Sequence, residues 1–245
     1  MSDLQWITPE WPAPSNVRAL TTTRTGGVSQ GAYASLNLAT HVGDNPASVL
    51  RNRGLLRERA RLPNEPRWLE QVHGTKVWTG GASHDPPIAD AAVTHAPREI
   101  CTIMTADCLP VLFTDVEGSV VGAAHAGWRG LASGVLGETL NAMEMPPERV
   151  IAWLGPAIEQ AAFEVGTEVR DAFLARNAEH AAAFVQNARG RWQSDIYRLA
   201  RGELLMLGVE GVYGGGFEVF ADSERFFSYR REKQTGRMAT LIWFE

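Results

Sequence analysis

Near the middle of the chain lies the run Val120-Val121-Gly122-Ala123-Ala124-His125-Ala126-Gly127-Trp128-Arg129-Gly130. Its first half is short and apolar, which predicts a buried strand over residues 120–124. Its glycine-rich second half predicts the start of a helix that continues to about Met143. His125 lies where the strand meets the helix, and its small neighbours allow a ligand or a metal ion to approach the backbone closely.

Strand and helix signals alternate irregularly on both sides of this run. Apolar or alternating segments predict strands at residues 17–23, 67–77, 100–105, 109–114 and 150–154, and a terminal pair of strands at 228–229 and 238–244. Capping residues predict helices from Asn45 and Pro46 to about Ala60, over 166–175, and from Ser194 or Asp195 to Leu207. Prolines at positions 9, 12 and 14 predict that residues 1–16 form an extended N-terminal arm.

This irregular order favours one α+β domain over residues 1–245, with mixed sheets, rather than a doubly wound parallel fold. Hairpin-like turns at Glu117-Gly118 and Thr235-Gly236 agree with strands that pair locally. No Gly-x-Gly-x-x-Gly unit joins a strand to a helix, so a dinucleotide cofactor is not expected.

The composition and net charge of the chain argue against several classes of binding partner. The net charge of −5, from 23 basic and 28 acidic residues, argues against a nucleic-acid-binding protein, which normally has a basic face. No apolar stretch reaches the ~18 residues of a membrane span, and the first residues lack the pattern of a signal peptide. Only two cysteines occur, so a disulfide framework is excluded. We expect a cytoplasmic protein that acts on a small molecule.

Three residues far apart in the chain are candidates for one site: His73, Cys108 and His125. Each lies in a short stretch rich in glycine and small residues, at the end of a strand-like run. One thiolate and two imidazoles form a three-ligand zinc set that leaves a fourth position for water or substrate. Gaps of 35 and 17 residues are unlike the tight spacing of a structural zinc site. The same trio also fits a cysteine nucleophile with a histidine base, so both alternatives predict an enzyme.

The remaining cysteine and histidines have ordinary interpretations. Cys101 lies in an apolar run and is expected to be a small buried hydrophobic residue. His84, His95 and His180 are expected at the surface.

Several stretches resemble the YfiH family of bacterial laccase-domain proteins, also called polyphenol oxidases and purine nucleoside phosphorylases. The resemblance runs from about Thr21 to Trp243 and includes the stretches around the three candidate ligands. Its other motifs are Ser35-Leu36-Asn37-Leu38, His41-Val42-Gly43-Asp44-Asn45, Trp153-Leu154-Gly155-Pro156, Phe163-Glu164-Val165-Gly166 and Phe227-Ser228-Tyr229-Arg230-Arg231. It implies a compact α/β sandwich of the YfiH type, with a metal held by His73, Cys108 and His125.

The resemblance also implies phosphorolysis of adenosine, inosine and methylthioadenosine, and deamination of adenosine. Deamination requires an activated water and a carboxylate that moves its proton, for which Asp107 is the first candidate and Asp90 the second. Phosphorolysis requires a cationic seat for phosphate. The candidates for this seat are Arg24, Arg129 and Arg230.

The same motifs place Asn37, His41 and Gln71 among the expected substrate contacts. The turn after His125 opens a helix, so its backbone N–H groups would favour an anion beside the metal. Arg230, from the Ser228-Tyr229-Arg230-Arg231 strand, would add a bidentate contact. The alternative is that Gly130 only allows the helix and the strand to pack closely.

Other functions remain as alternatives. The six histidines contain no His-x-His pair, so a multicopper site is not expected, although one Cu²⁺ fits the trio and would support polyphenol oxidation as a side activity. A Cys108-dependent hydrolase or amidase that edits peptidoglycan precursors is a second alternative. A metal-holding protein without a main catalytic role is a third.

Two departures from the family pattern affect the pocket near the end of the chain. Many members carry a cysteine where this chain reads Phe217-Glu218-Val219-Phe220. The frequent pattern Gly-Pro-Ala-Ile-Gly-Pro stands here as Gly155-Pro156-Ala157-Ile158-Glu159-Gln160. The three candidate metal ligands are unaffected by either departure.

Overall fold

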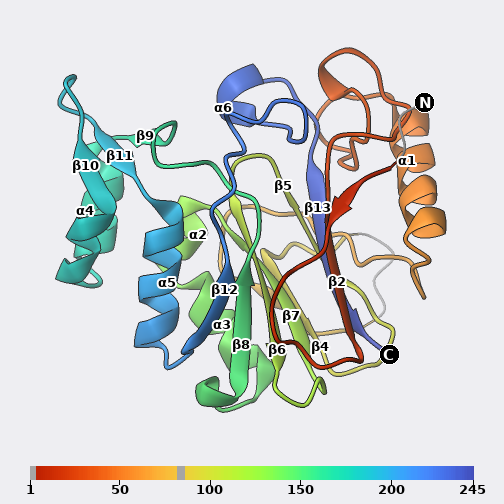
Figure 1. Cartoon of the computed structure of the whole chain (residues 1–245), viewed down its shortest axis with the longest axis horizontal. Helices are drawn as coiled ribbons and strands as arrows, with labels where there is room; N and C mark the ends of the chain where they lie inside the picture. The colour runs from red at the N-terminus through yellow and green to blue at the C-terminus, as the bar shows by residue number, and fades with distance from the viewer. Residues whose placement is uncertain (1–3, 82–85) are drawn as a thin grey trace.

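The computed structural model describes residues 4–81 and 86–245 and has three sheets (Figure 1). The six-stranded sheet has the order β12-β8-β6-β7-β4-β3, the four-stranded sheet has the order β1-β2-β13-β5, and the small sheet has the order β10-β11-β9. Most neighbouring strands are antiparallel, but β12 with β8 and β3 with β4 are parallel. These mixed sheets confirm the predicted α+β class.

The elements have the following bounds. The α-helices are α1 (Pro46–Arg59), α2 (Trp128–Ser133), α3 (Val135–Met143), α4 (Thr167–Leu174), α5 (Ile196–Met206) and α6 (Tyr229–Glu232), and the 3₁₀ turns are η1 (Gly31–Tyr33), η2 (Pro147–Arg149) and η3 (Ala178–Ala183). The strands are β1 (Trp6–Ile7), β2 (Val17–Thr22), β3 (Val77–Trp78), β4 (Ala91–Thr94), β5 (Cys101–Thr105), β6 (Leu109–Asp115), β7 (Val121–Ala126), β8 (Val150–Leu154), β9 (Glu164–Val165), β10 (Phe184–Gln186), β11 (Trp192–Ser194), β12 (Gly211–Gly214) and β13 (Met238–Phe244).

The six-stranded sheet is buried on both faces. Side chains alternate along a strand, so Val111 and Phe113 of β6 pack in one core with residues of α3 and α5, whereas Leu112 packs in a second core with residues of β5 and β13. Because both faces of β6 are covered, the strand is apolar throughout. The four-stranded sheet therefore lies on one side of the six-stranded sheet and helices α2, α3, α4 and α5 on the other, as in a sandwich (Figure 1).

The chain passes from one sheet to the other between β5 and β6. Cys101, at the start of β5, is fully buried between the two sheets, as predicted. Residues 106–108 form the link from β5 to β6, and Cys108 lies directly before β6. This link places a thiol at the edge where the two sheets meet.

Local signals predicted the helix ends well. Asn45 caps α1, and its side-chain oxygen accepts a hydrogen bond from the Ala47 amide at 2.9 Å, with Pro46 as the first helical residue. Asp195 caps α5 through the Arg198 amide at 2.9 Å. Both predicted helices are thus confirmed.

One predicted strand and one predicted helix are wrong. Residues 67–77 do not form a strand, because Asp90 accepts the amide protons of residues 72, 73 and 74 and bends the backbone into a turn, with His73 at φ +62°. Only isolated bridges at Arg67 and Glu70 and the short β3 occur there. The helix predicted from 127 to Met143 is interrupted at Gly134, whose φ of +98° ends α2 before α3 begins.

Near the C-terminus, residues 228–229 do not form the predicted strand. The Ser228 hydroxyl accepts a hydrogen bond from the Arg231 amide and so starts helix α6. The predicted strand at 238–244 is confirmed, but its partners are β2 and β5. The strands β4, β9, β10, β11 and β12 had not been predicted.

Three other predictions concern surface and arm positions. His95 is exposed as predicted, but His180 is 5% exposed and bonds to Glu203, so its surface assignment is wrong. His84 lies outside the described residues. The N-terminal arm is mostly irregular over its described part, although Trp6 and Ile7 pair with β2 as an edge strand.

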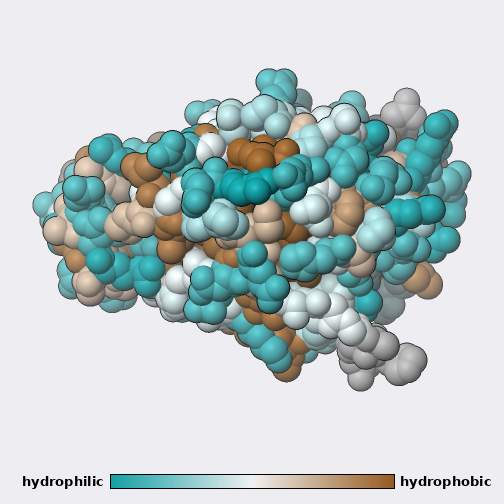
Figure 2. Space-filling model, turned by 90° about the horizontal axis from the view of Figure 1, so that it is seen from below, coloured by the Kyte–Doolittle hydropathy of each residue, from teal (hydrophilic) through white to brown (hydrophobic). Residues whose placement is uncertain are grey.

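The surface mixes polar and apolar groups. In the face shown in Figure 2, hydrophobic residues form separate small clusters between hydrophilic ones. Among the described residues, no helix is long and apolar enough to cross a membrane.

Candidate metal centre and its cavity

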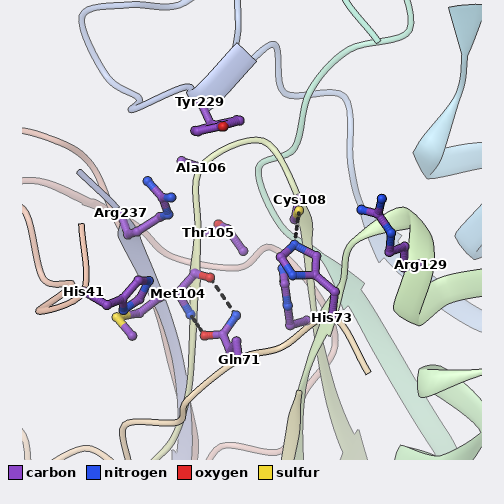
Figure 3. Close-up of a pocket in the computed structure, with 11 residues that line it drawn as sticks. His41, Gln71, His73, Met104, Thr105, Ala106, Cys108, Arg129, Tyr229 and Arg237 are labelled. Carbon is purple, nitrogen blue, oxygen red and sulfur yellow. Dashed lines mark hydrogen bonds between the residues drawn. The ribbon is translucent and has the colours of Figure 1, made fainter. Parts of the chain in front are cut away.

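Three side chains from different parts of the chain converge at one edge of the six-stranded sheet. The donor atoms of His73, Cys108 and His125 all lie within 4.8 Å of one another. The Cys108 Sγ is 3.8 Å from the His73 Nε2, and the two imidazole rings meet edge to face with centroids 4.7 Å apart (Figure 3). The structure therefore brings the three predicted ligands together.

Each ligand is held by a different local structure. His73 lies in the turn that precedes β3, and Cys108 lies in the link between β5 and β6. His125 is the second-last residue of β7 and stands opposite Pro110 in the antiparallel β6–β7 pair. The β6–β7 register thus brings Cys108 and His125 to the same end of the sheet.

Asp90 organises two of the three ligands. Its side chain is fully buried, and its Oδ1 lies 2.9 Å from the His125 Nδ1. This contact leaves the His125 Nε2 free to face the other donors, as is typical of metal-binding histidines. The same carboxylate accepts the His73 amide at 2.8 Å and the Gly74 amide at 2.6 Å. The sequence named Asp90 only as the second candidate for proton transfer, and its position between two alanines, directly before a buried strand, is the signal that could have indicated this orienting role.

The hydrogen bonds also set the charge of this carboxylate. Burial alone would raise the pKa of Asp90, but the hydrogen bonds from His125 and from the backbone outweigh burial and lower the pKa below its ordinary value. Asp90 is therefore a carboxylate that fixes the His125 ring and the turn carrying His73.

The space between the three donors exists because residue 127 is a glycine. A Cβ at Gly127 would lie 2.9 Å from the His73 Cδ2, 3.0 Å from the Cys108 Sγ and 3.5 Å from the His125 Nε2. The φ of Gly127 is −63°, so the backbone itself would accept any residue. One sulfur and two imidazole donors around such a cradle fit Zn²⁺, and also a single Cu²⁺.

The surroundings of Cys108 and His125 favour a thiolate and an imidazolium over the two neutral groups. Burial raises the pKa of Cys108, but the imidazoles of His125 and His73 outweigh burial and lower it to about 6. Burial lowers the pKa of His125, but the Cys108 sulfur and the Asp90 carboxylate outweigh burial and raise it to about 9. A thiolate is the form of cysteine that binds metals and attacks electrophiles.

The three ligands lie at one side of a cavity of about 360 Å³, a size suited to a small molecule (Figure 3). The other residues that line the cavity are His41, Gln71, Met104, Thr105, Ala106, Arg129, Tyr229 and Arg237.

Three of the predicted substrate contacts line this cavity: His41, Gln71 and Arg129. The Gln71 amide is bound to the backbone of Met104 at both ends, at 2.9 and 2.8 Å, and so forms a fixed wall. The pKa of His41 is lowered by burial and by the nearby cations Arg237 and Arg53, which favours the neutral imidazole. Arg129 is exposed, and its guanidinium stacks on the Trp128 ring.

The other predicted contacts do not line the cavity. Arg24 forms an ion pair with Glu232 at 3.3 Å. Arg230 donates to the carbonyl oxygens of Ala162 and Glu164 rather than reaching the cavity. Asn37 is fully buried, and its side-chain oxygen accepts the Arg237 amide at 3.0 Å.

Asp107 also makes structural contacts. Its Oδ2 accepts the Arg230 amide at 2.6 Å. Burial raises the pKa of Asp107, while hydrogen bonds from Ser228 and Arg230 oppose this effect. The carboxyl group therefore joins the loop of Cys108 to helix α6.

Arg237 and Tyr229 are two of the cavity residues that the sequence did not predict. Arg237 lies across the cavity from Arg129, and its Nη1 donates to the carbonyl oxygens of Thr235 and Gly236, both at 3.0 Å (Figure 3). Tyr229, the first residue of α6, lies above the cavity (Figure 3). Arg237 precedes β13, which pairs with β5, and no local pattern predicts this pairing.

Comparisons with known proteins agree over nearly the whole chain. The family model described as multi-copper polyphenol oxidoreductase laccase matches residues 18–245. A purine nucleoside phosphorylase of Pseudomonas aeruginosa is 54% identical over 241 residues, which cover 98% of each protein. The purine nucleoside phosphorylase YfiH of Escherichia coli is 51% identical over 238 residues, which cover 97% of this chain and 98% of the relative.

Solved structures show the same fold. The protein NMB0706 of Neisseria meningitidis has a TM-score of 0.94 at 52% identity and covers 98% of this chain and 99% of its own. The protein YlmD of Geobacillus stearothermophilus has a TM-score of 0.90 at 28% identity, with full coverage of both chains.

Proposed function

The chain belongs to the family described as multi-copper polyphenol oxidoreductase laccase, and from its similarity to relatives named as purine nucleoside phosphorylases we propose that it is a zinc-dependent enzyme of that type. The predicted resemblance to YfiH proteins and the YfiH-type fold are thereby confirmed. The relatives named as purine nucleoside phosphorylases support a function of this type. The observation that carries the proposal is a three-donor centre that opens on a cavity lined by two guanidinium groups.

The proposed substrates are adenosine, inosine and methylthioadenosine. In phosphorolysis, a phosphate oxygen forms a bond to C1′ of the ribose, and the bond from C1′ to N9 breaks. The base leaves with the bonding electrons and takes up a proton, so the products of adenosine are adenine and ribose 1-phosphate. Deamination of adenosine is proposed as a second activity. A cytoplasmic location stays a prediction from the sequence.

His73, Cys108 and His125 would hold the zinc ion through two imidazole nitrogens and one thiolate. When bound, zinc supplies a Lewis acid that polarises an oxygen and lowers the pKa of a coordinated water. Asp90 keeps the His125 ring in position and keeps the turn of His73 bent, so the donors are arranged before a ligand arrives.

Arg237 and Arg129 are the proposed contacts for phosphate. Arg237 is the better prepared of the two, because two carbonyl oxygens already hold its Nη1 and Asn37 holds its backbone. A guanidinium fixed in this way loses little conformational entropy when it binds an oxyanion. Arg129, on the opposite side, is exposed, and its guanidinium stacks on the Trp128 ring.

The proposed reaction is tested by identifying its products and by substituting two of the proposed metal ligands, His73 and Cys108. Adenosine and phosphate should yield adenine and ribose 1-phosphate, with some inosine from deamination. His73→Ala should lower both rates by at least about 10²-fold, since it removes a metal-activated group. Metal analysis should give about one zinc per chain in the wild type and less in Cys108→Ala. Unchanged phosphorolysis in His73→Ala would show that the three-donor centre does not perform this chemistry.

The phosphate seat is tested by Arg237→Lys. Lysine keeps the charge but loses the planar fork, so the KM for phosphate should rise by roughly 10-fold while zinc content stays constant. Arg198→Lys, on the exposed side of α5, is the matched control. A wild-type KM for phosphate in Arg237→Lys would assign the phosphate to another group.

A second candidate function is supported by the lowered pKa of Cys108 and its contact with His73. In that case Cys108 is the nucleophile of a hydrolase or amidase, with a histidine as its base. A thiolate bound to zinc is a poor free nucleophile, so the two functions predict opposite effects of metal. Activity that survives chelation and is lost on alkylation of Cys108 would favour the hydrolase.

A further inference from the structure

The contacts proposed for phosphate and metal leave Tyr229, which forms another wall of the cavity, without an assigned role. Tyr229 lies above the cavity in Figure 3, with its ring seen edge-on and one face turned inward, and Gln71 lies on the opposite side. Tyr229 lines the cavity and is 51% exposed as a residue, so part of its surface is open to a ligand. A flat aromatic ligand would cover this ring, since offset stacking of two π-systems is favourable.

The ring is carried by a turn that is held from several directions. The amide of Arg230 bonds to Asp107, and the guanidinium of Arg230 donates to the carbonyl oxygens of Ala162 and Glu164. The next residue, Arg231, donates to the carbonyl oxygens of Val219, Phe220 and Phe226. A side chain on such a fixed element is arranged before the ligand binds, which favours selective recognition.

One of these contacts connects α6 directly to the metal centre. Asp107 precedes the ligand Cys108 in sequence, and its 2.6 Å hydrogen bond is to the residue that follows Tyr229. Asp107 itself has a φ of +96°, a conformation that few residues other than glycine adopt. The strained backbone and the short contact together fix the distance between the metal ligand and the aromatic ring.

We propose that Tyr229 is the specificity-determining residue for the purine base, and that Asp107 is a positioning residue that holds Tyr229 above the metal ligands. The base stacks on the ring, and the sugar carbon that reacts points to the metal side. Arg237, whose guanidinium is 6.0 Å from the Tyr229 ring, bounds the same space. For the identity of the base, this inference rests on the function proposed above.

The stacking role is tested by a series at position 229. Tyr229→Phe keeps the ring and should keep the KM for adenosine within about 3-fold of wild type. Tyr229→Leu and Tyr229→Ala remove the ring and should raise this KM by roughly 5- to 150-fold, the range expected for one stacked base. The KM for phosphate and the zinc content should not change. Leu50→Ala, which alters an exposed residue of α1, is the control for a surface substitution.

The positioning role is tested by comparing two substitutions of Asp107. Asp107→Asn keeps an oxygen that accepts the Arg230 amide but cannot act as an acid, so a positioning role predicts a KM and kcat near wild type. Asp107→Ala removes the acceptor and should raise the KM for adenosine about as much as Tyr229→Ala. The double variant should be no worse than either single one, because both act through the same ring.

Thermal unfolding and zinc content are measured for every variant, to check that it folds as the wild type does. If Asp107→Ala loses either, the comparison passes to Ser228→Ala, which removes the hydroxyl that donates to the same carboxylate and that caps α6 at the Arg231 amide. The KM for adenosine should then rise by at least roughly 3-fold.

Several results would overturn the inference. A wild-type KM for adenosine in Tyr229→Leu removes Tyr229 from base recognition, and a loss of kcat in Asp107→Asn assigns Asp107 to proton transfer. Calorimetric binding of free adenine separates this inference from the proposed function. If the wild type does not turn over adenosine but binds adenine more tightly than Tyr229→Ala does, the phosphorylase proposal fails and the stacking role stands.

Discussion

Gly127 shows how one absent side chain can define a candidate metal site. Its missing Cβ leaves the space into which the His73 ring, the Cys108 sulfur and the His125 Nε2 all point. The need for glycine arises from the neighbours, since the backbone at this position has an ordinary negative φ. A substitution here therefore changes the site without straining the main chain.

We predict that Gly127→Ala abolishes zinc binding and leaves the fold intact. The added methyl would lie 3.0 Å from the Cys108 Sγ, closer than carbon and sulfur normally approach, so the donors must separate. Zinc content should fall from about one per chain to a small fraction, while circular dichroism stays unchanged. Gly54→Ala is the matched control, because a Cβ at Gly54 meets no atom within 4 Å. Full zinc content in Gly127→Ala would place the metal elsewhere.

At this scale, residue chemistry predicted which three donor side chains come together, but not the walls of their cavity. A thiol and two imidazoles in small-residue turns have a known joint chemistry, and the motifs supported it. Arg237 and Tyr229 carry no such signal, since arginine and tyrosine are common at surfaces. They reach the cavity because Met238 pairs with Thr105 and because Asp107 binds the turn after Tyr229.

At the scale of elements, one buried carboxylate joins α5 to η3 and to the segment that follows α4. Glu203 of α5 is 2% exposed and forms a bidentate pair with Arg176, at 2.9 and 2.8 Å. Its Oε1 also lies 2.9 Å from the Nε2 of His180, in η3. Burial would raise the pKa of Glu203, but the contacts with Arg176 and His180 outweigh burial and lower it below the ordinary value.

We predict that Glu203→Gln destabilises the protein by roughly 3 kcal/mol at neutral pH, at the lower end for a broken buried pair because Arg176 is partly exposed. A carboxylate with a depressed pKa stabilises the fold above the pKa of the unfolded chain. This stabilisation is lost as the pH falls through the lower pKa of the folded state.

Urea unfolding at a series of pH values checks this prediction. The difference between wild type and variant should be constant above about pH 5 and should shrink only in the acid range below the ordinary glutamate pKa. Glu210→Gln, outside this cluster, is the control. A difference that shrinks on the alkaline side instead would contradict the sign of the pKa shift.

Helices and strands were predicted correctly where the interactions that form them join residues close together in the sequence. Asn45 and Asp195 cap their helices through amides two or three residues away, and a sequence window contains this information. The strand predicted at 67–77 failed because the partner of its amides is Asp90, 16 to 18 residues further on. Short strands such as β9 and β12 were missed because two to four residues contain too little periodicity.

At the scale of the whole molecule, the metal site lies where the two large sheets meet. Cys108 follows β5 of one sheet and precedes β6 of the other, while His125 belongs to β7 and His73 to the turn before β3. The mixed-sheet class could be predicted from the irregular order of signals. The order of strands could not, since β13 pairs with strands that begin more than a hundred residues earlier.

This placement predicts how metal affects stability. Both sheets bury continuous apolar cores without the metal, so the metal-free protein should remain folded, unlike a zinc finger. Zinc binds the folded state, in which the three donors are assembled, more tightly than it binds the unfolded chain. At a free zinc concentration of 1,000 times Kd, the added stability is about 4 kcal/mol, which corresponds to a rise in Tm of roughly 8 to 16 °C for a chain of this length.

Thermal unfolding of metal-stripped and zinc-loaded protein measures this rise, and Gly127→Ala under the same conditions is its control. The Tm of the wild type should increase with zinc concentration, because zinc binds the folded state more tightly than the unfolded chain. The Tm of Gly127→Ala should not increase. A metal-stripped wild type that has already lost its tertiary structure would mean that the ion is structural. An equal rise in Gly127→Ala would mean that zinc stabilises the protein from a site other than His73, Cys108 and His125.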